Sequence, residues 1–437
     1  MNLTVSLQQR LTSKYLTMKK ILIKRIRLSN WKAKNLDVTF GADVTRISAK
    51  NEVGKSSLRQ AWNWVFTSYT SPTSQRNANL FDNRVPLSID TPEAGVKVWL
   101  EIDGTAYTIE RIAKASFKRL RGNKEWVKDS SDTYAILIDD IEYTATSFVE
   151  WVDNTIAPIE FMPYLLDGAF FTTLAINDKG RARAVIEHLV GGCDISELNG
   201  DYSRLGDKLV KFTPEQIQEH IAALMRPVKK RMSAIPAIIK SKEFVVNDLL
   251  KRYNAERLQD KVNELSKATS AFPNAETIAK LVATSMELGV AKYAEVEKEG
   301  IDLLVKENKA LACTLVEMEG DKAVADELIE EIAEIVSKKV NSLLDGYKIQ
   351  MYDIQKNGDR VPDCNITDMD GVKFATLSNS ARLRANIAIQ NMFRKVFGID
   401  MITWIDESSI FDSEHLPKPT GQTCYLFAGE SDTLVVE

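Results

Sequence analysis

A short segment near the N-terminus has the residue types of a phosphate-binding loop. The usual pattern is G-x-x-x-x-G-K-[ST], and residues 49–56 read AKNEVGKS, so that Ala49 replaces the first glycine. In such a loop Gly54 permits the tight turn, Lys55 neutralises phosphate charge and Ser56 can bind Mg²⁺. The alternative is a plain strand-to-helix turn with an exposed lysine. The residues expected to contact a phosphate group are Asn51, Glu52, Val53, Gly54, Lys55, Ser56 and Ser57.

The segments that flank this loop have the periodicity that such a site requires. Residues 21–40 alternate apolar and polar side chains over two expected strands, and residues 44–49, VTRISA, form a further short strand. After the loop, apolar residues recur at helical spacing at Leu58, Ala61, Trp62 and Val65. The order strand, loop, helix is the context in which a phosphate loop works.

Two adjacent carboxylates follow an apolar strand near the other end of the chain. Residues 401–409 read MITWIDESS, which predicts a strand over residues 401–405 followed by Asp406 and Glu407. We expect Asp406 to help hold Mg²⁺ and Glu407 to polarise an attacking water. Taken alone, the motif is also typical of a strand end with two solvated acids. The lysine loop elsewhere in the chain favours the catalytic interpretation.

A polar turn opens a predicted helix upstream of these acids. Residues 377–380 read LSNS and precede ARLRANIAIQNMFRKVF, which has helical spacing. A serine and backbone amides at a helix start suit a second phosphate contact, here from Ser378. Ordinary helix capping explains the same serine equally well.

Composition limits the classes of function. The 437 residues carry a formal net charge of −4, which excludes a globally basic nucleic-acid binder but leaves room for a local basic patch. The four cysteines lie far apart without a C-x-x-C pair, so neither a disulfide framework nor a cysteine zinc site is expected. No apolar run approaches the roughly 18 residues of a membrane span, and no signal-peptide core is present. We therefore expect a cytoplasmic protein without a membrane partner.

The pattern along the chain predicts an α/β fold assembled from two separated halves. Residues 1–18 are expected to be an extension, 19–205 the N-terminal half, 206–345 an inserted helical hairpin and 346–437 the C-terminal half. The sequence TPEQ predicts a helix start capped by Thr213. We expect interruptions at Pro227 and Pro236, and a turn near residues 267–275. A seven-residue apolar repeat, typical of a short coiled coil, occupies Leu304, Leu311, Met318 and Ala325.

The order lysine loop, helical hairpin, LSxS and apolar-strand-DE resembles the ATPase head of the SMC, SbcC and RecF superfamily, ABC-type ATPases of DNA repair and chromosome maintenance. Residues 164–191 are similar to the Q-loop region of SbcC, and residues 109–126 to small SMC-like ATPases of phages and prophages. The resemblance covers residues 19–205 and 346–437. It implies ATP and Mg²⁺ as cofactors, with Lys55 and Glu407 catalytic, Ser56 and Asp406 as magnesium ligands, and Ser378 acting in trans within a homodimer of heads.

The chain departs from the family pattern at several positions. The signature LSNSA lacks both usual glycines, Asp167 stands where the Q-loop glutamine is expected, and no histidine occupies the switch position, to which Ser431 or Asp432 is nearest. Asp412 follows Glu407 at about the distance of a D-loop aspartate, although it also fits an ordinary polar loop. These departures imply that hydrolysis is slow or depends on stimulation by a partner.

A basic cluster interleaved with Phe117 and Trp126 is the candidate DNA contact. Its spacing suits a phosphate backbone without base readout, and the alternative is a solvated loop. Its members are Lys114, Lys118, Arg119, Arg121, Lys124 and Lys128.

The resemblance implies a phage-type role in DNA recombination, repair or replication, with duplex DNA or its ends as ligand. No histidine-rich metal motif is present, so any nuclease would be a separate, SbcD-like subunit. Two alternatives remain: a sensor that regulates an anti-phage defence effector, and a structural clamp with a degenerate ATP site.

Overall fold

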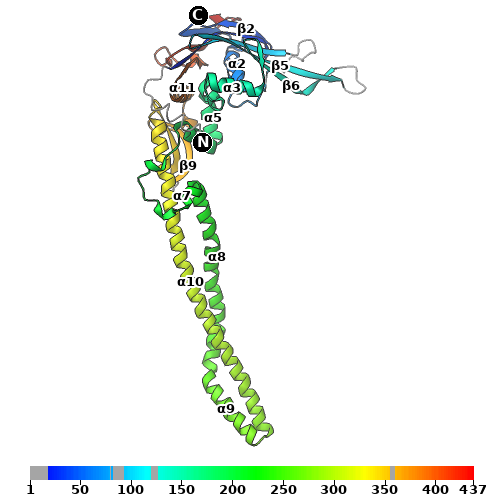
Figure 1. The fold of residues 1–437 in the computed structure, drawn as a ribbon, viewed down its shortest axis with the longest axis vertical. Coiled ribbons are helices and arrows are strands. Elements are labelled where there is room, and N and C mark those ends of the chain that lie inside the picture. Colours follow the sequence, from blue (N-terminus) through cyan, green and yellow to red (C-terminus); the bar gives the residue numbers. More distant parts are fainter. Residues whose placement is uncertain (1–17, 79, 82–92, 120–125, 355–359) are drawn as a thin grey trace. The chain divides into compact units, whose positions relative to one another are not determined.

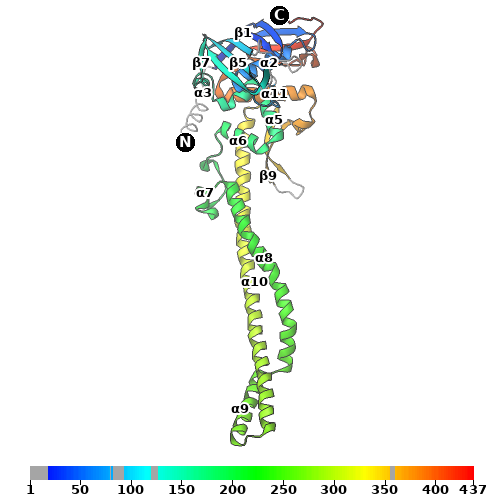
Figure 2. The same ribbon diagram turned by 90° about the vertical axis from the view of Figure 1, so that its right-hand side faces the viewer.

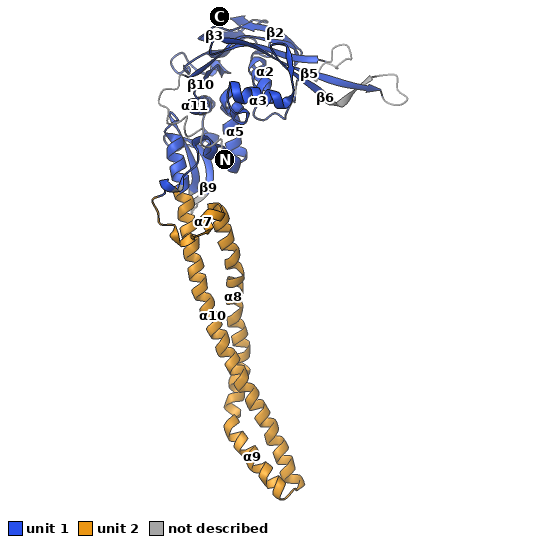
Figure 3. Cartoon of the chain, in the orientation of Figure 1, with its two compact units in different colours: residues 1–198, 332–437 blue, residues 199–331 orange. Residues whose placement is uncertain are grey.

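The computed structural model describes residues 18–78, 80–81, 93–119, 126–354 and 360–437. Contacts divide the chain into two compact units (Figure 3). Unit 1 contains residues 1–198 and 332–437, and unit 2 contains residues 199–331.

The larger sheet of unit 1 has seven strands in the order β10-β1-β4-β5-β6-β7, with β2 paired to β1 (Figure 1). The hairpin turn between β4 and β5 lies at Asp103 and Gly104, and the turn between β6 and β7 lies at Asp139 and Asp140. The strands of this sheet are β1 (Lys19–Trp31), β2 (Lys34–Thr39), β4 (Glu93–Ile102), β5 (Thr105–Arg119), β6 (Trp126–Ile138), β7 (Ile141–Tyr143) and β10 (Ile399–Met401).

The two larger sheets of unit 1 each combine strands from the two ends of the chain. In the larger sheet β1 pairs in parallel with β10. The smaller sheet has the order β11-β12-β3-β13, with β3 (Val44–Ala49) parallel to β12 (Thr423–Ala428). Its other strands are β11 (Thr403–Ile405) and β13 (Val435–Val436), and β8 (Tyr347–Ile354) with β9 (Arg360–Asp368) forms a separate hairpin. The predicted α/β class and assembly from two separated halves are confirmed.

The prediction of one strand over residues 401–405 is wrong. Met401 ends β10 in the larger sheet and Thr403 begins β11 in the smaller one, so the chain changes sheets at Ile402. The guanidinium of Arg394 holds this crossing, because it donates to the Ile402 carbonyl and the Thr403 hydroxyl at 2.7 Å each. A continuous apolar run contains no signal for such a change of partner.

Helix α2 (Lys55–Thr67) carries much of the core. Its apolar face, predicted from Leu58, Ala61, Trp62 and Val65, is fully buried, and Trp64 packs against Trp31 of β1 with tilted rings whose centroids lie 4.8 Å apart. The helix contacts β3 of the smaller sheet and β1, β4 and β5 of the larger one. The other α-helices in the described residues of unit 1 are α3 (Ala145–Thr155), α4 (Met162–Leu166), α5 (Ala169–Asn177), α6 (Lys179–Val190) and α11 (Asn379–Phe397).

Unit 2 is built from long antiparallel helices (Figure 2). Helix α8 (Pro214–Arg252) begins at the predicted Thr213 cap, where Thr213 and Gln216 form a reciprocal capping box. Helices α8 and α9 (Ala255–Ala271) form the first arm of the hairpin. Helix α10 (Ala275–Asn341) forms the second arm and runs antiparallel to the first. Ion pairs join the arms in antiparallel order, from Lys229 with Glu319 to Lys242 with Glu297. A short helix, α7 (Lys208–Lys211), precedes α8.

The predicted interruptions at Pro227 and Pro236 do not occur, because α8 continues through both prolines. A proline removes one backbone hydrogen bond from a helix and costs about 3 kcal/mol. Buried Met225 precedes the first proline, buried Ile235 and the ion pair of Arg231 with Glu307 lie between the two, and buried Val246 follows the second. Tertiary packing therefore overrides the local penalty.

Among the described residues no single helix has the length and apolar composition to cross a membrane. One bent pair, residues 159–166 with 169–177, meets that test only when its two parts are taken together.

Glu331 is expected to make unit 2 sensitive to acid. Its carboxylate accepts hydrogen bonds from the Tyr202 hydroxyl at 2.6 Å and from the backbone amides of Asn199 and Gly200. These donors lower the pKa of Glu331 to about 2. Since the folded pKa lies below the ordinary value of 4.5, this stabilisation is complete above pH 4.5 and is lost as the pH falls towards 2.

We predict that Glu331→Gln lowers the free energy of unfolding at neutral pH by about 1 kcal/mol after solvent screening. Thermal melts followed by circular dichroism between pH 7 and pH 3 should show a shallower acid loss for this variant than for the unchanged chain. Glu327→Gln, one turn earlier and exposed, is the control. Equal acid profiles for the unchanged chain and the Glu331→Gln variant would contradict the assignment.

Candidate nucleotide-binding site

The loop between β3 and α2 has the backbone that its sequence predicts. Gly54 precedes α2 with φ +124°, and a Cβ at this position would lie 2.8 Å from Leu36 Cδ1. Only glycine satisfies both the backbone angle and the close contact. Ala49, which replaces the first glycine of the pattern, ends β3 and is not among the described residues with positive φ. Its methyl group is therefore compatible with the loop.

The loop and the paired carboxylates line one pocket of about 420 Å³. The pocket brings together Asn51, Glu52, Gly54, Lys55, Ser56, Ser57, Asp406 and Glu407 of the predicted site, while Val53 does not line it. Gln60, Ser409, Ile410, Leu426 and Ala428 also line it and were missed, since nothing in their local sequence marks them.

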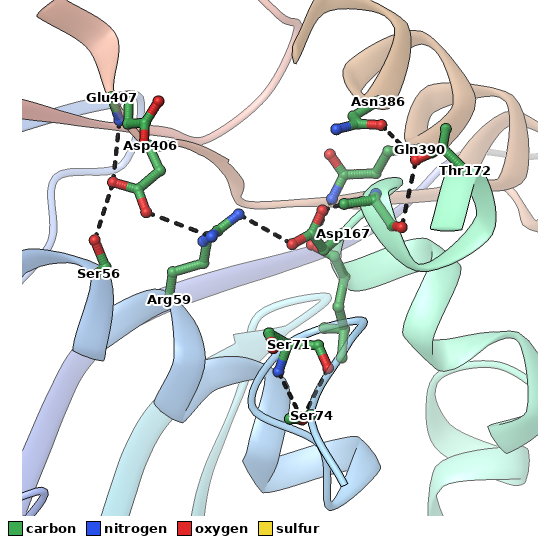
Figure 4. Close-up of polar contacts among 12 residues, drawn as sticks. Ser56, Arg59, Ser71, Ser74, Asp167, Thr172, Asn386, Gln390, Asp406 and Glu407 are labelled. Carbon is green, nitrogen blue, oxygen red and sulfur yellow. Dashed lines mark hydrogen bonds and ion pairs between the residues drawn. The ribbon is translucent and has the colours of Figure 1, made fainter. Parts of the chain in front are cut away.

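Ser56 and Asp406 meet directly although 350 residues separate them. The Ser56 hydroxyl donates to Asp406 Oδ1 at 3.2 Å (Figure 4). A hydroxyl and a carboxylate are the hard oxygen donors that Mg²⁺ prefers, and Mg²⁺ usually binds one or two protein ligands together with nucleotide phosphates and water. No group of three or more His, Cys, Asp or Glu side chains in the described part of the chain could hold a metal by itself. The donor set thus fits a magnesium ion that is shared with a phosphate.

The Lys55 side chain contacts the backbone of its own loop. Its ammonium donates to the carbonyls of Ala49 at 2.6 Å and Lys50 at 2.7 Å. Burial lowers the pKa of Lys55, and the nearby Asp406 carboxylate partly offsets this. Helix α2 has no side-chain cap at its N-terminus, so its first amides have no capping partner from that source. A cation and uncapped helix amides together favour an anion at this position.

Arg59 connects Asp406 of the pocket with Asp167, the residue at the expected Q-loop position. The sequence analysis did not identify it. It lies one turn after Ser56, and its guanidinium contacts Asp406 Oδ2 at 3.4 Å and Asp167 Oδ2 at 3.1 Å (Figure 4). All three side chains are at most 23% exposed. The three-residue spacing from Ser56 could have indicated it, because such residues share one helix face.

Glu407 has a backbone conformation that is costly for its residue type. Its φ is +55° and its ψ is +35°, in the left-handed region, which costs a non-glycine residue about 1 kcal/mol or more. The Glu407 amide donates to Asp406 Oδ1 at 3.0 Å, and the Glu407 side chain is exposed in the pocket. Strain of this kind is concentrated at functional sites.

The remaining predicted residues lie outside this pocket. Ser378 is exposed and caps α11, accepting from the Ala381 amide at 3.3 Å. Asp412 is exposed and accepts from His415 Nδ1 and the His415 amide, which lowers the pKa of Asp412. Near the switch position, Asp432 forms an ion pair with Lys50 at 2.9 Å, and the Ser431 carbonyl accepts from the Lys50 amide.

The candidate DNA residues are only partly described. Lys118 and Arg119 are exposed at the end of β5, and Lys114 pairs with Glu93 at 2.9 Å. The backbone of Lys128 lies in β6, opposite Phe117. Arg121 and Lys124 lie outside the described residues.

No family model and no curated protein sequence matches this chain. Among solved structures it is similar to the Smc head domain with a coiled coil and joint from Pyrococcus yayanosii, with 13% identity, 95% of this chain and 97% of that chain covered, and a TM-score of 0.41. It is also similar to the recombination mediator protein RecF with ATP, with 11% identity, coverage of 96% and 94%, and a TM-score of 0.35. At these values the likeness does not establish a family, and the function is inferred from the site's own geometry.

Proposed function

We propose that this chain is an ATP-binding and ATP-hydrolysing protein of the ABC type. The observation that carries the proposal is the hydrogen bond between Ser56 and Asp406, which joins the phosphate loop and the paired acids in one pocket. The alternative of a simple strand-to-helix turn does not explain why a pair of carboxylates from the other end of the chain lies beside the loop serine.

Each residue of the pocket has a role that its position supports. Lys55 and the first amides of α2 would hold the nucleotide phosphates, and Ser56 with Asp406 would hold Mg²⁺. The metal neutralises the phosphate charge when it is bound. Glu407 has an exposed carboxylate in the same pocket and would accept a proton from the attacking water. Arg59 would keep Asp406 oriented through its second contact with Asp167.

The proposal includes a homodimer formed around ATP. Ser378 is exposed at the N-terminus of the 19-residue helix α11 and does not line the pocket of its own chain. A hydroxyl and helix amides at this position suit a phosphate that is held by a second copy. Each ATP would then contact Lys55 of one protomer and Ser378 of the other, with Asp412 near the contact.

Duplex DNA is the proposed ligand of the dimer, within phage-type recombination, repair or replication. The pairing of β5 supports this proposal. Up to Lys114, β5 pairs with β4 on one side and β6 on the other, whereas its described residues beyond Lys114 pair with β6 alone. Lys118 and Arg119 are exposed on this two-stranded segment, and a β-ribbon with cations can follow a phosphate backbone. Any nuclease activity would belong to a separate subunit.

Steady-state ATP hydrolysis, measured with and without linear duplex DNA, tests the proposal. We expect Glu407→Gln to lower turnover at least about 100-fold, because a general base contributes that much or more. ATP binding should be retained, and addition of ATP should raise the association of this variant above its nucleotide-free level in sedimentation experiments. Glu414→Gln changes an exposed acid of the following loop and should leave turnover unchanged. Failure of the unchanged chain to bind Mg-ATP would refute the proposal and favour a structural clamp.

A further inference from the structure

Helix α10 carries two apolar stripes over residues 282–303. One stripe faces the other arm and is buried, with Thr284, Leu288, Ala291, Ala294 and Ile301 at most 8% exposed. The second stripe alternates steps of four and three residues, the spacing of a coiled-coil seam. It consists of Val282, Met286, Gly289, Tyr293, Val296, Gly300 and Leu303, and we call it the outer stripe.

The outer stripe is exposed along its length. Its five large side chains are exposed by 49% at Val282, 69% at Met286, 58% at Tyr293, 65% at Val296 and 64% at Leu303. Because an α-helix turns by about 100° per residue, the outer stripe and the buried stripe lie on roughly opposite sides of α10. A single helix packed against one partner needs only one such stripe. The second stripe, roughly 32 Å long, has no partner among the described residues of unit 2.

The two glycines of the outer stripe have no explanation within the chain. A glycine inside a helix costs about 1 kcal/mol relative to alanine. A Cβ built at Gly289 or at Gly300 meets no atom within 4 Å, so neither glycine makes room for another part of this chain. Gly320 of the same helix differs, because a Cβ there would lie 2.5 Å from the Arg204 guanidinium. Glycines on a seam allow a second helix backbone to approach closely.

The charges beside the outer stripe fit a second, antiparallel copy of the same helix. In such a pair Tyr293 faces Val296 of the second copy, Met286 faces its Leu303, and Gly289 faces its Gly300. Lys292 and Glu299 are both exposed and flank the stripe, and in this register Lys292 of one copy lies opposite Glu299 of the other. The Lys292 ammonium also donates to the neutral Gln259 side chain at 2.8 Å, which leaves its charge without a counter-ion in that contact. A parallel pair would instead bring Lys292 towards Glu297, which is already paired with Lys242 at 2.6 Å.

We propose that the outer stripe of α10 is a homotypic interface on which the arms of two copies pair as an antiparallel coiled coil. The interface lies entirely in unit 2 and contains no residue of the nucleotide pocket. It is therefore independent of ATP and distinct from the proposed dimer of heads.

The oligomeric state of the full chain without nucleotide tests the interface. Sedimentation equilibrium in the micromolar range should show dimers, and Met286→Glu combined with Leu303→Glu should weaken dimerisation at least about tenfold, since it buries charge in an apolar seam. Val316→Glu is the matched control, because Val316 is 68% exposed on α10 but lies off the outer stripe. The proposal would be overturned if the unchanged chain is a monomer, or if the double variant still dimerises fully. A monomeric unchanged chain would overturn it even if a different protein binds the outer stripe.

A charge exchange tests the register. Lys292→Glu and Glu299→Lys should each weaken the dimer, and the two changes together should restore it, because opposite charges again face each other. Restoration would show that both changes together are compatible with folding, and that charge accounts for the weaker dimers of the single variants. A combined variant that remains as weak as the single ones would overturn the antiparallel register. Because all samples lack ATP, these outcomes are separate from success or failure of the ATPase proposal.

Discussion

Lys55→Met is expected to lower the affinity for Mg-ATP by about 10- to 100-fold, the value of a charge-assisted hydrogen bond lost from a partly buried site. The Lys55 ammonium already lies on the loop, held by the carbonyls of Ala49 and Lys50. Its lowered pKa reflects burial, so a phosphate group would meet a partly desolvated cation. Isothermal titration with ATP and a non-hydrolysable analogue measures the change.

Lys50→Met is the control for this prediction. Lys50 belongs to the same loop and carries the same charge, but its side chain is exposed and pairs with the still more exposed Asp432 at 2.9 Å. Such a surface ion pair contributes about 0–1 kcal/mol, so ATP affinity should change by less than about fivefold. Equal losses in the two variants would mean that Lys55 acts only through the net charge of the loop.

Arg394→Met is expected to destabilise unit 1 by about 3–5 kcal/mol. The buried Arg394 guanidinium donates to the carbonyls of Leu165 and Ile402 and to the Thr403 hydroxyl. Burial lowers the pKa of Arg394 to about 9, while Asp400 and Asp167 favour its charged form. Methionine fills similar space but removes the guanidinium donor to the Ile402 carbonyl and the Thr403 hydroxyl, at the point where the chain changes sheets. The Leu165 carbonyl keeps its hydrogen bond from the Gln390 amide at 3.1 Å.

Urea unfolding followed by tryptophan fluorescence measures this loss for unit 1 alone, because all seven tryptophans lie in that unit. Lys395→Met, at the next position of α11, removes a half-exposed cation that pairs with Asp345 and should cost less than about 1 kcal/mol. If both variants unfold at the same urea concentration, the buried hydrogen bonds of Arg394 are not what holds the sheets together.

The local elements of the site could be read from the sequence. Strand β3 and the start of α2 lie where their residues predict them, as does the Thr213 cap in unit 2. Each depends on signals within a few residues: alternation of apolar side chains, a glycine before a lysine, or a threonine three residues before a glutamine. The sequence also supplied both halves of the pocket, the lysine loop and the paired acids.

The long-range contacts could not be read in the same way. The spacing places Arg59 on the same helix face as Ser56, but its bridge between Asp406 and Asp167 depends on how α2, β11 and the end of α4 meet in unit 1. The break at Ile402 has the same origin, because a run of apolar residues is compatible with one strand or with two. The helix through Pro227 and Pro236 exists because packing along α8 outweighs a local penalty.

The two stripes of α10 separate what the sequence determines from what only the tertiary structure decides. The sequence by itself determined that the helix is long and apolar at heptad spacing, because periodicity is a property of the order of residues. Only the tertiary structure decided that Leu288 and Ala291 are buried while Met286 and Val296 are exposed. Burial depends on which face the other arm covers, and that is settled by packing over the whole length of the arms rather than by any segment of the chain.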